Sequence, residues 1–98
     1  MSSSATEIKA TTAHSVDFAE DSLVVNLSDG RSISVPYSWY PRLEHGTAAE
    51  RSRWQLIADG QGIRWPDLDE DIRVSDLLAG ICSGESTESL QRWLQGRG

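Results

Sequence analysis

Two short stretches of alternating apolar and polar residues, separated by Asp29 and Gly30, are the feature that most limits the fold of this chain. In residues 23–27 and again in residues 31–35, every second side chain is apolar. This period of two is typical of a strand with one buried face. An Asp-Gly pair between such runs favours a tight turn, because glycine adopts a positive φ without a steric penalty. The sequence therefore predicts a β-hairpin over residues 23–35, ended by Pro36, which cannot donate a ladder hydrogen bond.

The other predicted elements are short. Residues 14–18 and 63–65 read as strands, with Val16 and Phe18 on one face of the first. Helical turns are expected after Pro41, from a capping box at Thr47 and Glu50 as far as Ala58, and from a Ser75 cap to Gly80. Residues 88–95 form a last helix with the apolar face Leu90, Trp93 and Leu94. We therefore expect an α+β fold, with a small antiparallel sheet and short helices on one side.

The length of 98 residues indicates one domain with a modest core. Residues 1–12 are rich in Ser, Thr and Ala, and are expected to form a flexible lead-in with Ile8 as a candidate edge-strand residue. The α+β domain is then predicted over residues 13–80. A linker and the C-terminal helix are predicted over residues 81–98.

The negative net charge of the chain indicates which kinds of partner it can bind. The formal net charge is −6 and the pI is near 4.7. Phosphate contacts need Lys and Arg, so this charge argues against nucleic acid and suits a basic protein partner. Cys82 is the single cysteine, which excludes an intramolecular disulfide. The N-terminus does not resemble a signal peptide and no run is long enough to span a membrane, so a cytoplasmic protein is expected.

The segment Asp67–Asp71 is the densest group of charges. Asp67, Asp69 and Asp71 have the spacing that opens a calcium-binding loop, but Ile72 and Leu78 stand where that loop needs Gly and Glu. One interpretation is a solvated acidic loop. The other is a surface that engages Arg or Lys side chains of a partner.

No pattern of catalytic or metal-ligating residues is evident. His14 and His45 have no nearby cysteine or second histidine, and Cys82 has no adjacent base. We therefore expect neither an enzyme nor a metal or other cofactor.

Arginine and aromatic residues are interleaved in the middle third of the chain. Such interleaving is compatible with binding of single-stranded nucleic acid. The alternative is that arginines such as Arg64 or Arg73 pair with the acidic loop and that the aromatic residues fill the core, leaving one or two exposed as contact residues. The residues concerned are Arg42, Arg51, Arg53, Arg64, Trp39, Tyr40, Trp54 and Trp65.

Residues 30–80 resemble a bacterial family known only as a domain of unknown function. The resemblance rests on Val35-Pro36, on the run from Trp39 to Leu43, and above all on the Trp-Pro…Asp-Glu-Asp-Ile run of residues 65–72. Members often carry His before the Trp-Pro pair, whereas this chain has Arg64, so no role of that His carries over. The tail from Ile81 is not typical of the family.

The resemblance implies an α+β domain that occurs in short acidic proteins or before a helix-turn-helix. It also implies a small two-gene, antitoxin-like module in which the acidic member neutralises a small basic protein encoded nearby. The predicted partner-binding residues are Asp67, Asp69, Glu70, Asp71, Arg64, Trp65, Trp39 and Arg42. The alternatives are a nucleic-acid-associated regulator that uses Arg51, Arg53, Arg64 and exposed Trp residues, and a small-ligand site at the aromatic cluster. A homo-oligomer is compatible with all three.

Overall fold

The computed structural model of the chain describes residues 11–97. The predicted lead-in and its candidate strand at Ile8 therefore lie almost wholly outside the described residues. Two three-stranded antiparallel sheets form the framework, with strand orders β1-β2-β3 and β4-β5-β6. The predicted α+β class is confirmed, although the strands form two sheets and not one. The strands are β1 (Ala13–Phe18), β2 (Ser22–Leu27), β3 (Ser32–Pro36), β4 (Gln55–Ile57), β5 (Gly62–Trp65) and β6 (Glu70–Arg73).

The predicted hairpin is strands β2 and β3. Their register places Leu23 opposite Val35 and Val25 opposite Ile33, so the apolar sides of both alternating runs face the core. Gly30 has a φ of 94° in the turn, as the Asp-Gly pair predicts. The hairpin prediction is confirmed because turn and alternation specify the same register.

Strand β1 pairs with β2 through an irregular register between Ala13 and Ser15. The extra residue brings both Ala13 and Val16 to the buried face, three positions apart instead of two. Phe18 is partly buried against the same core, as predicted.

The helix predicted from Thr47 to Ala58 is wrong beyond its first turn. The capping box forms: Thr47 Oγ1 accepts from the Glu50 backbone N–H, and Glu50 Oε1 accepts from that of Thr47. However, α2 (Ala48–Ser52) ends there, and residues 55–57 pair with β5 as strand β4. Ala58 has a φ of 52°, which no right-handed helix allows. Pairing with β5 therefore overrides the local helical pattern.

The acidic segment is only partly a loop. A turn over residues 66–69, in which Asp69 has a φ of 50°, leads directly into β6 at Glu70. Helix α3 (Val74–Ala79) follows at once. Its N-terminal cap is Arg73 with no side-chain hydrogen bond, so the predicted Ser75 cap is wrong. Gly80 ends α3 with a φ of 76°, as predicted.

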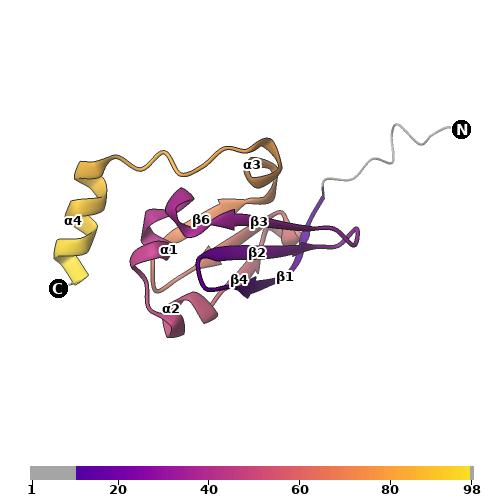
Figure 1. Cartoon of the computed structure of the whole chain (residues 1–98), viewed down its shortest axis with the longest axis horizontal. Helices are drawn as coiled ribbons and strands as arrows, with labels where there is room; N and C mark the ends of the chain where they lie inside the picture. Colours follow the sequence, from indigo (N-terminus) through magenta and orange to yellow (C-terminus); the bar gives the residue numbers. More distant parts are fainter. Residues whose placement is uncertain (1–10, 98) are drawn as a thin grey trace, which may run out of the picture.

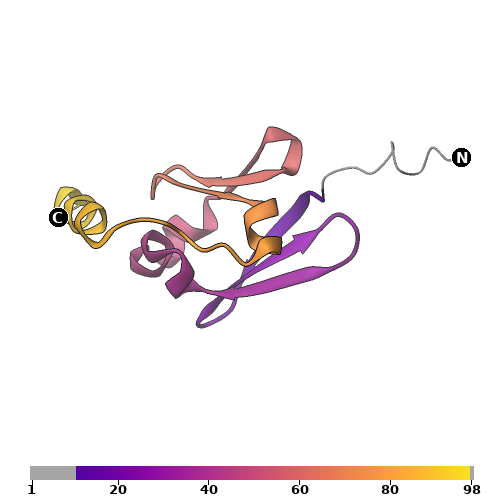
Figure 2. The same cartoon turned by 90° about the horizontal axis from the view of Figure 1, so that it is seen from above.

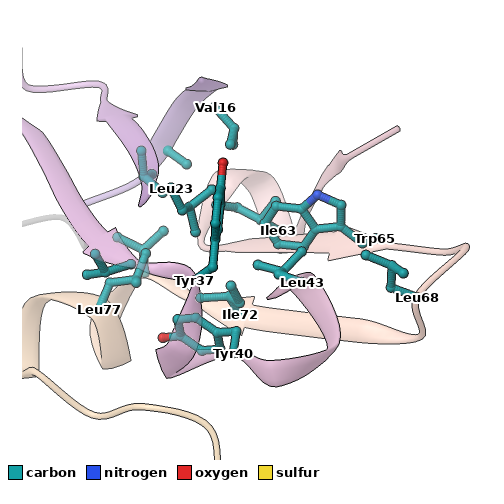
Figure 3. Packing of buried hydrophobic residues seen from close by; sticks show 14 of the residues in the cluster. Val16, Leu23, Tyr37, Tyr40, Leu43, Ile63, Trp65, Leu68, Ile72 and Leu77 are labelled. Carbon is teal, nitrogen blue, oxygen red and sulfur yellow. The ribbon is translucent and has the colours of Figure 1, made fainter. Parts of the chain in front are cut away.

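The core lies between the two sheets, and Figures 2 and 3 show its layers and packing. Trp65, Leu43 and Leu68 are fully buried beside one another near the end of β5. A 3₁₀ turn, η2 (Tyr37–Trp39), and helix α1 (Pro41–His45) carry the chain from the first sheet toward the second. The short segment η3 (Ala58–Gly60), whose three residues all have positive φ, joins β4 to β5.

The chain leaves the core after α3. Residues 81–86 form no helix or strand, and α4 (Thr87–Arg97) follows at one end of the molecule, beside α1 in Figure 1. No residue of α4 is buried. We refer to Ile81–Arg97 as the C-terminal arm.

Candidate partner-binding surface

Strands β5 and β6 place charged residues on their outer face. Arg64 lies directly opposite Asp71, so their side chains share one face of the sheet. Arg64 Nη1 lies 2.7 Å from Asp71 Oδ1, and Nη2 lies 3.2 Å from Asp69 Oδ1. The Asp69 and Asp71 side chains remain 72% and 54% exposed. These two carboxylates are therefore paired within the chain but open to a partner.

Two further arginines surround the turn. Arg53 Nη1 is 2.7 Å from Asp67 Oδ2. Arg42 binds Glu85 of the C-terminal arm at 2.6 Å and reaches the backbone oxygen of Asp69 at 3.1 Å. The predicted pairing of Arg64 with the acidic segment is thus confirmed, whereas the ion pairs of the described residues include none with Arg73. We call Asp67, Asp69, Glu70, Asp71 and Glu85 the acidic cluster. Four of its carboxylates share three guanidiniums, and Glu70 forms none of these ion pairs.

Glu70 differs from its neighbours because it points inward. It pairs across the ladder with buried Trp65 and alternates with buried Ile72, so its side chain starts on the core side of the sheet. Burial raises the pKa of Glu70 to about 7, and the nearby carboxylates of Glu85 and Asp71 add to the rise. Arg42 acts in the opposite direction but does not offset this effect. Glu70 is therefore a carboxyl that titrates near neutral pH.

A pocket of about 370 Å³ lies beside Glu70 and is also lined by Tyr40, Asp76 and Cys82. Burial raises the pKa of Tyr40 to about 12. The Tyr40 hydroxyl donates to the backbone oxygen of Ile81 at 3.3 Å, which commits it to holding the arm. Two groups with raised pKa values thus meet here, as a small-ligand site would require, but the tyrosine serves a structural hydrogen bond.

The prediction that Trp65 contacts a partner is wrong. It is fully buried, and its indole Nε1 donates to the Arg51 backbone oxygen at 2.9 Å. An indole has one donor, which this bond satisfies, so Trp65 is a core residue. Trp39 and Trp54 are partly buried against the core.

The arginines of the nucleic-acid alternative are already engaged. Arg51 donates to the backbone oxygens of Leu43 and Gly46 and lies 5.0 Å from the centre of the Tyr37 ring. Arg53 and Arg64 hold the carboxylates described above. No observation therefore favours a basic, phosphate-binding surface.

Within residues 11–97, no group of three or more His, Cys, Asp or Glu residues could hold a metal ion. No described helix is long and apolar enough to cross a membrane.

Sequence reasoning missed one residue of this surface, Glu85, and the direction of another, Glu70, which it predicted as a contact residue. Glu70 stands two positions before Ile72, and this spacing of two was a signal that it begins a half-buried strand. Glu85 gave no such signal, since its contact with Arg42 depends on how the arm folds back.

Comparisons with known proteins agree with this fold. A family model described as "Protein of unknown function (DUF2442)" matches residues 13–83. No curated protein matches the chain. A protein of unknown function from Rhodospirillum rubrum ATCC 11170, in a crystal structure at 2.75 Å resolution, has a TM-score of 0.69 and 22% identity over 79% of this chain and 95% of its own. The uncharacterized protein CV0863 from Chromobacterium violaceum, solved by solution NMR, has a TM-score of 0.66 and 19% identity over 83% of this chain and 74% of its own.

Proposed function

Since the chain belongs to the DUF2442 family of proteins of unknown function, we propose its function from its own surface: it is a non-enzymatic protein-binding module. We propose further that it is the acidic, neutralising member of a small two-gene, antitoxin-like module. The predicted resemblance to a domain of unknown function holds, and the match begins at residue 13. The acidic cluster engages the basic partner.

The observation that carries this proposal is the unequal count of charges around the β5–β6 turn. Four carboxylates share three guanidiniums, Glu70 adds a fifth carboxyl without an ion pair, and Asp69 and Asp71 are largely exposed. The turn is fixed by the buried residues Trp65 and Leu68 on either side of Pro66. A basic partner therefore meets carboxylates whose positions are already set, which reduces the entropy lost on binding.

The existing ion pairs do not close this surface. An exposed pair contributes about 0–1 kcal/mol, so a Lys or Arg of a partner can join or replace an internal arginine at small cost. Charges of opposite sign also accelerate association and favour the correct partner. The net charge of −6 acts in the same direction over longer distances.

The non-enzymatic part of the proposal rests on the pocket beside Glu70. Catalysis by a nucleophile needs a base within hydrogen-bond reach and a third group that orients the base. The Tyr40 hydroxyl is directed to the arm, and Glu70 accepts no hydrogen bond from a described residue. Of the two pocket groups with raised pKa values, Glu70 alone is then free to react, which supports a binding surface over an active site.

Affinity capture from the host cell tests the proposal. The wild-type chain is compared with Asp69→Asn/Glu70→Gln/Asp71→Asn and with a control, Asp17→Asn/Glu20→Gln/Asp21→Asn, which makes the same three kinds of exchange at exposed positions of β1 and the β1–β2 turn. We expect the wild type and the control to retain a stoichiometric small basic protein at about 50 mM salt and to lose it near 500 mM, as the Debye length falls from about 14 to about 4 Å. Equal retention by the cluster variant would refute the role of the acidic cluster.

A further inference from the structure

The C-terminal arm is attached to the domain mainly by polar and charged contacts, and Trp93 packs against the core. Its start is held by three hydrogen bonds: Ile81 N–H donates to the Asp76 oxygen and Ser83 N–H to the Trp39 oxygen, both at 2.9 Å, and the Tyr40 hydroxyl donates to the Ile81 oxygen. Glu85 then binds the Arg42 guanidinium through three hydrogen bonds of 2.6 to 3.0 Å. Within residues 11–97, all fully buried apolar side chains lie between residues 13 and 77, so the arm adds only the partly buried Trp93 to the core.

Helix α4 adds one aromatic contact and one ion pair. The Arg42 and Arg97 guanidiniums lie 5.1 and 4.6 Å from the centre of the Trp93 ring. Arg97 also pairs with Glu50 of α2 at 2.6 Å. An isolated helix of eleven residues is marginal in water, so α4 is stable only while these contacts hold it against the domain.

Arg42 is the shared element between the arm and the acidic cluster. Glu85 takes its Nε and Nη2 donors, while Nη1 turns to the Asp69 backbone oxygen. The positive charge of Arg42 lowers the pKa of Glu70, but Arg42 donates no hydrogen bond to this carboxyl. While the arm is docked, Glu85 therefore holds the guanidinium that would best stabilise an ionised Glu70.

The arm also shields Glu70 from water. Ile81, Cys82, Ser83 and Gly84 form one wall of the pocket beside Glu70. The charged and titratable groups around Glu70 are Asp69, Asp71 and Arg73 of the turn and β6, Tyr40 before α1 and Arg42 within it, Asp76 of α3, and Cys82 and Glu85 of the arm. Arg42 and Arg73 are the cations in this set, and Arg42 is the one that lowers the pKa of Glu70. An ionised Glu70 there is therefore both desolvated and surrounded mainly by negative charge.

We propose that the C-terminal arm is a proton-operated latch, which closes over Arg42 when Glu70 is protonated and detaches when Glu70 ionises. Detachment exposes the pocket to water and frees the Arg42 guanidinium to pair with Glu70. It also uncovers the backbone oxygen of Trp39 and the hydroxyl of Tyr40, the groups that hold Ile81 and Ser83. The latch operates whether or not the acidic cluster binds a basic protein.

The pH dependence of arm closure follows from the pKa of Glu70 in the closed and open states of the arm. In the closed state the pKa of Glu70 is about 7, and in the open state solvent returns it toward the ordinary value of 4.5. Closing therefore takes up a proton between these values, and the closed fraction falls as the pH rises. With these two pKa values as the limits, the ratio of closed to open arm falls by up to about tenfold between pH 6 and pH 8.

Hydrogen exchange of the α4 amides, followed by NMR on the full chain, measures this ratio. Protection factors are used because they remove the base catalysis of exchange itself. In the wild type we expect the protection of residues 90–94 to fall about tenfold from pH 6 to pH 8. In Glu70→Gln it stays within about twofold, because the neutral amide cannot ionise.

Two further variants and an internal reference distinguish detachment of the arm from unfolding of the whole domain. Glu85→Gln loses the ion pair with Arg42 and lowers α4 protection at every pH, whereas Glu88→Gln, on the exposed side of α4, behaves as the wild type. The amides of β2 around Val25 report whether the core is intact in each variant. Equal pH dependence of α4 protection in the wild type and in Glu70→Gln, or constant wild-type protection over this range, would overturn the proposal.

Discussion

Replacing Glu70 by Gln isolates the energetic cost of placing a carboxyl on the core side of β6. Glu and Gln have nearly the same shape, so the exchange removes the titration and leaves the packing against Trp65 and Ile72. The pKa of Glu70 is raised, to about 7, so the folded chain binds more protons than the unfolded chain between pH 4.5 and pH 7. The free energy of unfolding therefore falls as the pH rises through this window and then levels off.

The destabilisation caused by Glu70 at high pH can be worked out from its pKa in the folded and in the unfolded chain. A rise of about 2.5 units corresponds to at most about 3.4 kcal/mol at pH 8. The side chain is partly open to solvent, and screening reduces this to about 1–2 kcal/mol. At pH 5 most of the penalty is absent, because the unfolded chain then also binds much of the proton.

Urea unfolding followed by tryptophan fluorescence at pH 5 and pH 8 measures the difference. We expect Glu70→Gln to be more stable than the wild type by about 1–2 kcal/mol at pH 8 and nearly equal to it at pH 5. Glu20→Gln removes the same charge from an exposed turn and should follow the wild type at both pH values. A Glu70→Gln chain that is less stable than the wild type at pH 8 would refute the inward placement of this carboxyl.

Three further substitutions test the packing, each by its free energy of unfolding in urea. Trp65→Phe should cost about 2–3 kcal/mol, because the smaller ring leaves a void and the Arg51 oxygen loses its donor; a loss under 1 kcal/mol would contradict full burial. Thr47→Ala should cost about 1 kcal/mol through loss of the cap of α2, and no change would mean the capping box contributes nothing. Gly60→Ala should cost about 1–3 kcal/mol, since φ is 88° and the new Cβ would lie 3.2 Å from the Ala13 oxygen; a stable variant would rule out this strain.

The elements that the sequence predicted well are those in which local signals agree. In the hairpin of residues 23–35, the alternation and the turn chemistry specify one register. The capping box at Thr47 and the αL glycine at Gly80 also formed as predicted, because each depends on residues only a few positions apart.

The missed features depend on contacts between distant segments. Residues 55–57 became a strand because β5 supplies a pairing edge, which no local pattern reveals. Trp65 was predicted to contact a partner, but its burial is set by α1, α2 and the β5–β6 turn together. The acidic segment was correctly located, yet its alternation with Ile72 was overlooked, and so was the inward direction of Glu70.

A growth assay tests the neutralising role most directly. The proposed partner, a small basic protein encoded nearby, is expressed alone, then with the wild type, the acidic-cluster variant Asp69→Asn/Glu70→Gln/Asp71→Asn, or the control variant Asp17→Asn/Glu20→Gln/Asp21→Asn. We predict that the basic protein alone stops growth, that the wild type and the control restore it, and that the cluster variant does not. Absence of toxicity, or no rescue by the wild type, would contradict the neutralising role, and rescue by the cluster variant would contradict the assignment of that role to residues 69–71.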